Sequence, residues 1–185
     1  MTSCSFLQQE GVLFWGDVSR QGKEGISQMH WRFHQFHSDI GQVALRLLVY
    51  LPLEQRSKVV EVARHFTMVL SSTWSAEDGT AGVLFGSWSG KYEDGVKPSA
   101  WTGTRQIFKK YLQERQQQSV KYGQCWVFSA ILTSVYRYLG IPTRSVSNFR
   151  SAHEKPPYDH LISSKDKDGS TWNFHVWGEC ESPQL

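Results

Sequence analysis

The sequence predicts an α+β fold, because most of its helical patterns come first and two strand-like patterns close the chain. Its 185 residues lie within the range of one domain, and its 39% apolar content favours a globular core over disorder. No internal repeat and no linker-like segment divides the sequence. We therefore expect one globular unit of mixed helices and strands.

Short apolar segments near the start favour strands, and longer periodic segments favour helices. Residues 11–15 are apolar and begin at a glycine, and residues 29–33 alternate, so a strand is expected in each. Ser38 is a candidate N-cap of a helix whose apolar residues keep helical spacing until Pro52. A second helix with one apolar face is expected from Ser57.

The middle of the chain predicts a loop and two further helices. Residues 71–82 are rich in Ser, Thr, Gly and acidic residues, which is typical of a loop. From about Thr104, apolar and charged residues occupy opposite faces of a helix that runs to the glutamines at 116–118. Residues 125–139 are apolar nearly all round, which indicates a buried helix, and the Gly-Ile-Pro that follows ends it.

Two alternating segments close the predicted fold. Residues 143–149 and 172–177 alternate as strands do. A polar loop joins them and contains Pro156-Pro157 and the acidic segment 166–169. The two strands are therefore expected to follow the buried helix.

Composition excludes several classes of protein. The net charge of +3 is small and the basic residues are spread along the chain, so no nucleic-acid role is expected. Cys4, Cys125 and Cys180 are odd in number and lack metal-ligand spacing, which argues against a disulfide framework or a zinc site and favours a reducing compartment. No secretory signal and no run of ~20 apolar residues occurs. We expect a soluble, cytoplasmic protein without a membrane span.

Cys125 is a candidate nucleophile because it begins the buried helix. A thiolate there lies near the positive end of the helix dipole, and with an imidazolium close by the pKa of a cysteine falls from ~8.5 toward ~4 to 7. The alternative is a small apolar core residue, which is the commoner role of a lone cysteine. Gln124 precedes it, and is interpreted as an oxyanion donor or, more simply, as a structural residue.

His175 is the candidate base. Its neighbours Phe174 and Val176 point to the opposite face of a strand, so His175 can face a cleft while they pack. The alternative is an ordinary core histidine. If the pair is functional, a ring nitrogen of His175 is expected within ~4 Å of the Cys125 sulfur.

Several motifs occur in the order found in one family. They are Tyr-Gly-Gln-Cys-Trp at 122–126, Leu-Gly-Ile-Pro-Thr-Arg at 139–144, Ser-Ala-His at 151–153, Trp-Asn-Phe-His-Val-Trp at 172–177, and upstream segments at 31–36, 86–88, 94–96 and 99–103. The chain resembles the animal transglutaminases, which are calcium-dependent protein-glutamine gamma-glutamyltransferases. In segment 31–36, His34 replaces the usual glycine of that family.

The resemblance implies a papain-like cysteine transferase core with Cys125 as nucleophile and His175 as base. It also assigns Trp88 as a donor to the tetrahedral oxyanion, with its indole N–H directed toward the space above Cys125. The implied substrates are protein glutamines together with lysines or polyamines. Residues 1–8 would be an N-terminal tail, and residues 9–185 the N-terminal part of the catalytic core.

Departures from the family pattern limit what the resemblance implies. The family's third catalytic residue, an Asp on a later strand, has no counterpart before Leu185, so the core is expected to be incomplete at its C-terminal side. Glu179 is either a substitute or, more simply, an acidic residue without catalytic duty. The implied calcium has no identifiable ligands: Asp166-Lys-Asp-Gly169 is better interpreted as a solvated turn, and the acids of 75–79 cannot be matched.

Two functional hypotheses remain. The first is a protein-glutamine gamma-glutamyltransferase that works through a cysteine thioester. The alternative is a catalytically inactive, truncated transglutaminase-like protein with a binding or regulatory role. Because the carboxylate that fixes the imidazole is missing, we expect the 185-residue chain alone to have little or no crosslinking activity.

Overall fold

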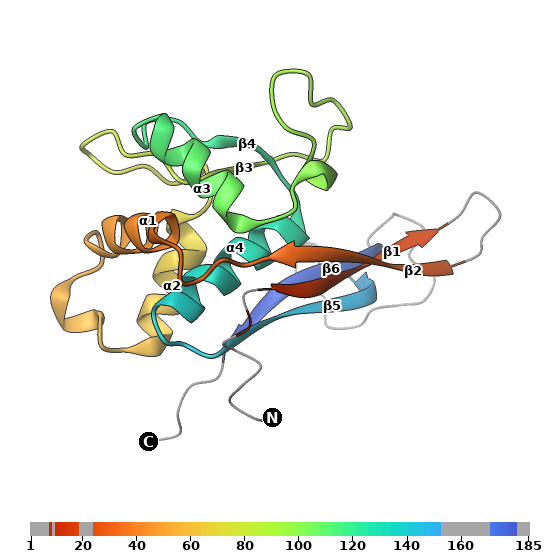
Figure 1. Cartoon of the computed structure of the whole chain (residues 1–185), viewed down its shortest axis with the longest axis horizontal. Helices are drawn as coiled ribbons and strands as arrows, with labels where there is room; N and C mark the ends of the chain where they lie inside the picture. The colour runs from red at the N-terminus through yellow and green to blue at the C-terminus, as the bar shows by residue number, and fades with distance from the viewer. Residues whose placement is uncertain (1–7, 9, 19–23, 153–170, 181–185) are drawn as a thin grey trace, which may run out of the picture.

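The computed structural model describes residues 8, 10–18, 24–152 and 171–180. Figure 1 shows the helices gathered at one end of the molecule and the two long hairpins at the other, with α4 between them. The elements are β1 (Glu10–Val18), β2 (Glu24–Arg32), α1 (Ser38–Leu48), η2 (Leu53–Gln55), α2 (Val59–Val69), β3 (Leu84–Gly86), η3 (Pro98–Ala100), α3 (Thr104–Gln113), β4 (Val120–Gly123), α4 (Cys125–Tyr138), β5 (Thr143–Ala152) and β6 (Thr171–Cys180).

The strands among the described residues form three pairs. β1 with β2 and β5 with β6 are antiparallel hairpins, whereas β3 and β4 are parallel. The chain crosses from β3 to β4 through η3 and α3, as parallel strands require. Helices and strands thus combine in the predicted α+β manner.

The helices lie close to their predicted positions, with corrections at their ends. α1 starts at Ser38, but its N-cap is His37, whose ring nitrogen accepts a hydrogen bond from the backbone N–H of Asp39 at 3.1 Å. α2 starts at Val59, two residues after the predicted Ser57. α3 ends at Gln113, before the glutamine tract.

α4 is the central element of the core. Val127, Ala130, Ile131 and Val135 are fully buried, and they join one cluster that includes apolar side chains from β1, β2, β3, α1, α2, α3, β4 and β6. Buried hydroxyl groups fix the helix against its neighbours: Thr104 accepts from the Trp31 indole at 3.0 Å and bonds Ser134 at 2.6 Å. In the part of the chain that the structure describes, no helix is both long and apolar enough to span a bilayer.

Candidate active site

The parallel pair β3–β4 brings two predicted site residues to one edge. Gly86 pairs with Gly123, and the N–H of Ser87 donates to the Gly123 carbonyl at 3.0 Å. Parallel strands end at the same edge of a sheet. Trp88 is two residues after Gly86, and Cys125 is two residues after Gly123. Both therefore lie at that edge of the strand pair.

Cys125 is the first residue of α4 and only 8% of its surface is exposed. Its thiol lies beside the backbone N–H of Val176, in the peptide that joins His175 to Val176. Since the N–H groups of a strand lie in the plane of its sheet, the thiol meets β6 at an edge. The structure thus brings Cys125 to the backbone of the predicted base.

The protonation behaviour of Cys125 differs from the prediction of a lowered pKa. Burial raises the pKa of the Cys125 thiol, and the nearby backbone N–H groups of Val176, Trp126 and Cys125 act in the opposite direction without overcoming it. Desolvation disfavours the charged thiolate more than these dipoles favour it. The thiol is therefore the resting form near neutral pH.

Trp88 lies in the loop after β3 and is 57% exposed. A Cβ placed on Gly86 would lie 3.1 Å from Cζ3 of Trp88 and 3.3 Å from Cε2 of Phe128, which belongs to the first turn of α4. The six-membered ring thus rests over Gly86, where a Cβ would fit only if these neighbours moved by a few tenths of an ångström. The pyrrole N–H is at the opposite end of the indole from Cζ3.

Strand alternation puts His175 on the face of β6 opposite to Phe174 and Val176. Its neighbours face inward: Val176 is 3% exposed, and the Phe174 ring lies 5.8 Å from that of Trp126. His175 instead lies 5.9 Å from the Trp177 ring, and its Nδ1 is shielded from solvent. A separation of ~4 Å between the His175 ring and the Cys125 sulfur stays a prediction.

Glu179 belongs to an ion pair on the same strand. Its carboxylate lies 2.9 Å from Arg144 Nη2 on β5 and accepts from the Trp177 indole at 3.4 Å. Four residues of strand separate it from His175 by about 13 Å. The structural interpretation of Glu179 is therefore favoured, since a carboxylate that orients an imidazole must lie within hydrogen-bond reach.

The Gln124 side chain has no donor left for an oxyanion. Its amide nitrogen donates to the Ser87 carbonyl and to the Tyr92 hydroxyl, each at 3.0 Å. Sequence reasoning missed Tyr92, because nothing in its spacing shows that a loop residue returns to the start of α4. The structural interpretation of Gln124 is the one that the contacts favour.

The described residues show no cluster of acidic side chains for the implied calcium. They contain no group of three or more His, Cys, Asp or Glu side chains placed to hold a metal. The Asp78 carboxylate accepts from the Tyr50 hydroxyl at 2.7 Å and from the Thr80 N–H at 3.0 Å, and Asp94 accepts from Lys121 at 2.7 Å and from Tyr122. The segment Asp166–Gly169 lies outside the described residues.

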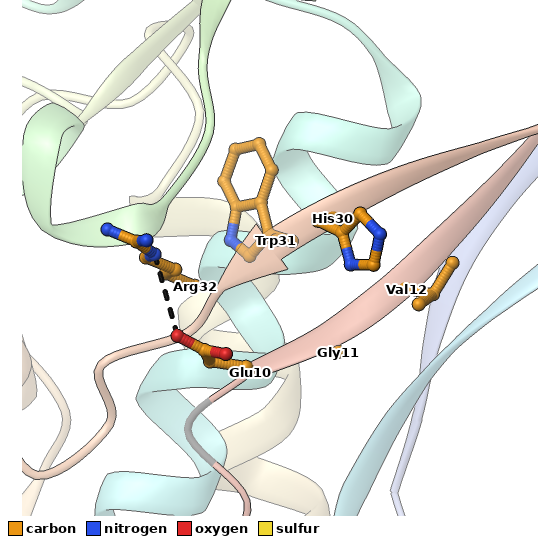
Figure 2. A pocket seen from close by; sticks show the side chains of 6 residues that line it. All are labelled: Glu10, Gly11, Val12, His30, Trp31 and Arg32. Carbon is orange, nitrogen blue, oxygen red and sulfur yellow. Dashed lines mark ion pairs between the residues drawn. The ribbon is translucent and has the colours of Figure 1, made fainter.

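A separate groove of about 360 Å³ lies along the hairpin β1–β2. Figure 2 shows Glu10 and Arg32 as an ion pair across it, at 3.5 Å, with Trp31 turned away from that pair. The residues that line it are Glu10, Gly11, Val12, His30, Trp31 and Arg32. The groove contains neither Cys125, His175 nor Trp88.

Comparisons with known proteins point to one family. The profile of the Transglutaminase-like superfamily matches residues 92–184. The chain is 35% identical to protein-glutamine gamma-glutamyltransferase 2 of Gallus gallus and 36% identical to protein-glutamine gamma-glutamyltransferase E of Mus musculus; the matches cover 94% and 93% of this chain but 26% of each relative.

Solved structures agree with this assignment. The fold is similar to that of red sea bream transglutaminase, with a TM-score of 0.72 and 32% identity over 95% of this chain and 28% of that one. The chain therefore spans about a quarter of the length of the proteins it matches. The predicted family and α+β fold are confirmed: this chain belongs to the transglutaminase-like superfamily.

Proposed function

We propose that this chain carries part of a site for acyl transfer from peptide glutamine to an amine. The observation that carries the proposal is the meeting of three elements: the N-terminus of α4 with Cys125, the adjacent strand end with Trp88, and the backbone of β6 at His175. Its support from outside the structure is the similarity to gamma-glutamyltransferases. Protein glutamines are the proposed acyl donors, and lysines or polyamines the acceptors.

In the proposed reaction His175 takes the Cys125 proton and the sulfur attacks the glutamine carboxamide carbon. The developing oxyanion accepts a hydrogen bond from the Trp88 indole. Ammonia leaves with the proton from His175, which produces a thioester. An amine then attacks the thioester carbonyl, loses its proton to His175, and forms an isopeptide while the thiol is restored.

The raised pKa of Cys125 means that the proposed reaction needs His175 to remove the thiol proton. Because the resting cysteine is a thiol, attack on the carboxamide requires a base in contact with it. The carboxylate that would orient this base is not among the described residues near it, since Glu179 is held by Arg144. We expect acylation by a reactive ester to survive in this chain and transfer from glutamine itself to be slow.

The test separates these two steps. The chain is incubated with a p-nitrophenyl ester of a glutamine-like acyl group, and the mass adduct is mapped by peptide. We expect an adduct on Cys125 that Cys125→Ser loses and that His175→Gln slows. Equal acylation of the wild type and Cys125→Ser would contradict the proposal.

A second assay tests transfer itself. Incorporation of a labelled amine into a glutamine-rich protein, with and without millimolar calcium, should be weak or absent for this chain and should depend on Cys125. The alternative function, a binding or regulatory protein without turnover, predicts no acylation even by the reactive ester. A cytoplasmic location is also proposed, since a free thiol persists in a reducing compartment; secretion of the tagged chain would contradict it.

A further inference from the structure

Gln124, Ser87 and Tyr92 form a closed triangle of hydrogen bonds at the start of α4. The Gln124 amide nitrogen donates to the Ser87 carbonyl and to the Tyr92 hydroxyl, both at 3.0 Å, and the Tyr92 hydroxyl donates to the same carbonyl at 3.4 Å. A carbonyl oxygen only accepts, so the Gln124 group that faces it must be the NH₂. Two sides of this triangle thus end at the carbonyl of Ser87, the residue before Trp88.

The loop that carries Trp88 is also held to β4: Asp94 accepts from Lys121 at 2.7 Å and from Tyr122, and the Tyr92 ring lies 5.5 Å from the Tyr122 ring. The Ser87 and Ser89 hydroxyls lie 3.0 Å apart, and Gly90 has a positive φ of 78°, which makes a tight local turn. The ends attach to β4, where the Ser87 N–H donates to Gly123 at 3.0 Å and the Val96 N–H donates to Lys121 at 2.8 Å. The Gln124 side chain joins the inside of this loop to the helix.

We propose that Gln124 is a positioning residue, which fixes the Trp88 loop to the N-terminus of the helix that begins with Cys125. This inference rests on the proposed function. Both Gln124 amide hydrogens are directed at loop acceptors, so the side chain acts through Trp88 and not on the oxyanion. Because Gln124 directly precedes Cys125, one dipeptide sets the place of the nucleophile and of the loop that bears the oxyanion donor.

Loss of the Gln124 carboxamide should therefore displace Trp88 and slow the acylation of Cys125. An oxyanion donor contributes only when it lies at hydrogen-bond distance from the developing charge. Displacement of a catalytic group by about 1 Å costs up to roughly 100-fold in rate. We expect Gln124→Met, which keeps the length of the side chain without its donors, to lower the maximal acylation rate of Cys125 about tenfold with little change in the half-saturating ester concentration.

The first measurement follows Trp88 directly and needs no activity. The chain is labelled with 5-fluorotryptophan, and the Trp88 fluorine resonance is assigned with Trp88→Phe. Gln124→Met should shift or broaden this resonance while the other seven tryptophan resonances stay in place. Gln106→Met is the matched control: the Gln106 carboxamide on α3 is also bonded within the protein, since it accepts from the Thr102 N–H and donates to the Thr102 hydroxyl, each at 3.2 Å.

Gln124→Glu supplies a reversible version of the same test. At neutral pH its carboxylate cannot donate to the Ser87 carbonyl, whereas the protonated acid at low pH can. The Trp88 resonance of this variant should return toward the wild-type position as the pH falls, and the wild type should show no such transition. Tyr92→Phe removes one corner of the triangle and should shift the Trp88 resonance less than Gln124→Met does. It replaces Gln124→Met in this test if that variant fails to fold.

The outcomes separate this inference from the proposed function. An unchanged Trp88 resonance in folded Gln124→Met overturns the positioning role, and so does a changed resonance with an unchanged acylation rate. Absence of any Cys125 acylation in the wild type overturns the proposed function instead. In that case the resonance still reports whether Gln124 holds the loop, but the role in acyl transfer falls with the function.

Discussion

The two sides of the candidate site are held in different ways. On the side of Cys125 and Trp88, β3 and β4 pass through the core, where Leu84 and Val120 are at most 1% exposed, and α4 follows directly. On the side of His175, the ribbon β5–β6 packs one face on α4 and carries partly exposed Trp177 and Arg144 on the other. The nucleophile is thus fixed by the core, and the base by a ribbon packed on one face.

Truncation of a large side chain on each side should give the largest contrast. Ile131→Ala in α4 should lower the free energy of unfolding by about 2–5 kcal/mol, because it leaves an enclosed cavity. Trp177→Ala on β6 should cost less than about 1.5 kcal/mol although it removes more atoms, because water fills the space at a residue that is 36% exposed. Urea unfolding measures both, and equal losses would break the comparison.

Two glycine substitutions sharpen the same contrast with a single methyl group. A Cβ on Gly123 would lie 2.3 Å from Cδ2 of the fully buried Leu84, so Gly123→Ala should cost about 1–3 kcal/mol. A Cβ on Gly178 of β6 would meet nothing closer than 3.8 Å, so Gly178→Ala should stay within about 0.5 kcal/mol. The midpoints of thermal unfolding give the result, and a tolerated Gly123→Ala would show that β3 and β4 separate easily.

The two described cysteines should differ in alkylation. Cys180 at the end of β6 is exposed, whereas Cys125 is buried and its pKa is raised by that burial. Because only the thiolate reacts, a raised pKa means that alkylation of Cys125 by iodoacetamide is slow at pH 7 and rises about tenfold per pH unit up to that pKa. Peptide mapping after timed quenching follows each cysteine, and fast labelling of Cys125 at pH 7 would contradict the raised pKa.

The smallest effect is expected for Glu179→Gln. Its carboxylate pairs with Arg144, and both side chains are more than 40% exposed, so loss of the pair should cost at most about 1 kcal/mol. Acylation of Cys125 by the reactive ester should keep its rate and its pH dependence. A rate that falls with Glu179→Gln but not with Arg144→Gln would restore Glu179 as a partner of His175.

Apolar periodicity predicted the long helices, whereas the predicted cap Ser38 and the predicted helix start at Ser57 were wrong and the short strands depend on tertiary contacts. The starts of α3 at Thr104 and α4 at Cys125 agree with the predicted positions, because each helix carries its own apolar pattern. β3 and β4 were missed, since three and four residues show no period and become strands only by pairing with each other.

The same division applies to the site. The motifs indicated Cys125, His175 and Trp88 as candidates, and the parallel strand ends place Cys125 and Trp88 at one edge. The prediction of a lowered Cys125 pKa was wrong because it counted the helix dipole and omitted the burial of the thiol. The link from Gln124 to Tyr92 depends on how a loop folds back, which no local pattern encodes.

The parallel pairing of Gly86 with Gly123 has a consequence for the lengths that the chain tolerates. The connection between them is a closed loop, and doubling the length of a flexible loop costs only about 0.6 kcal/mol. A Cβ on Gly90, at the turn of the Trp88 loop, would meet nothing within 4 Å, so added residues there would extend into open space. Insertions at this turn should therefore leave the strand ends in register, whereas a single residue added directly after Cys125, inside α4, would turn Cys125 by about 100° relative to the rest of its helix.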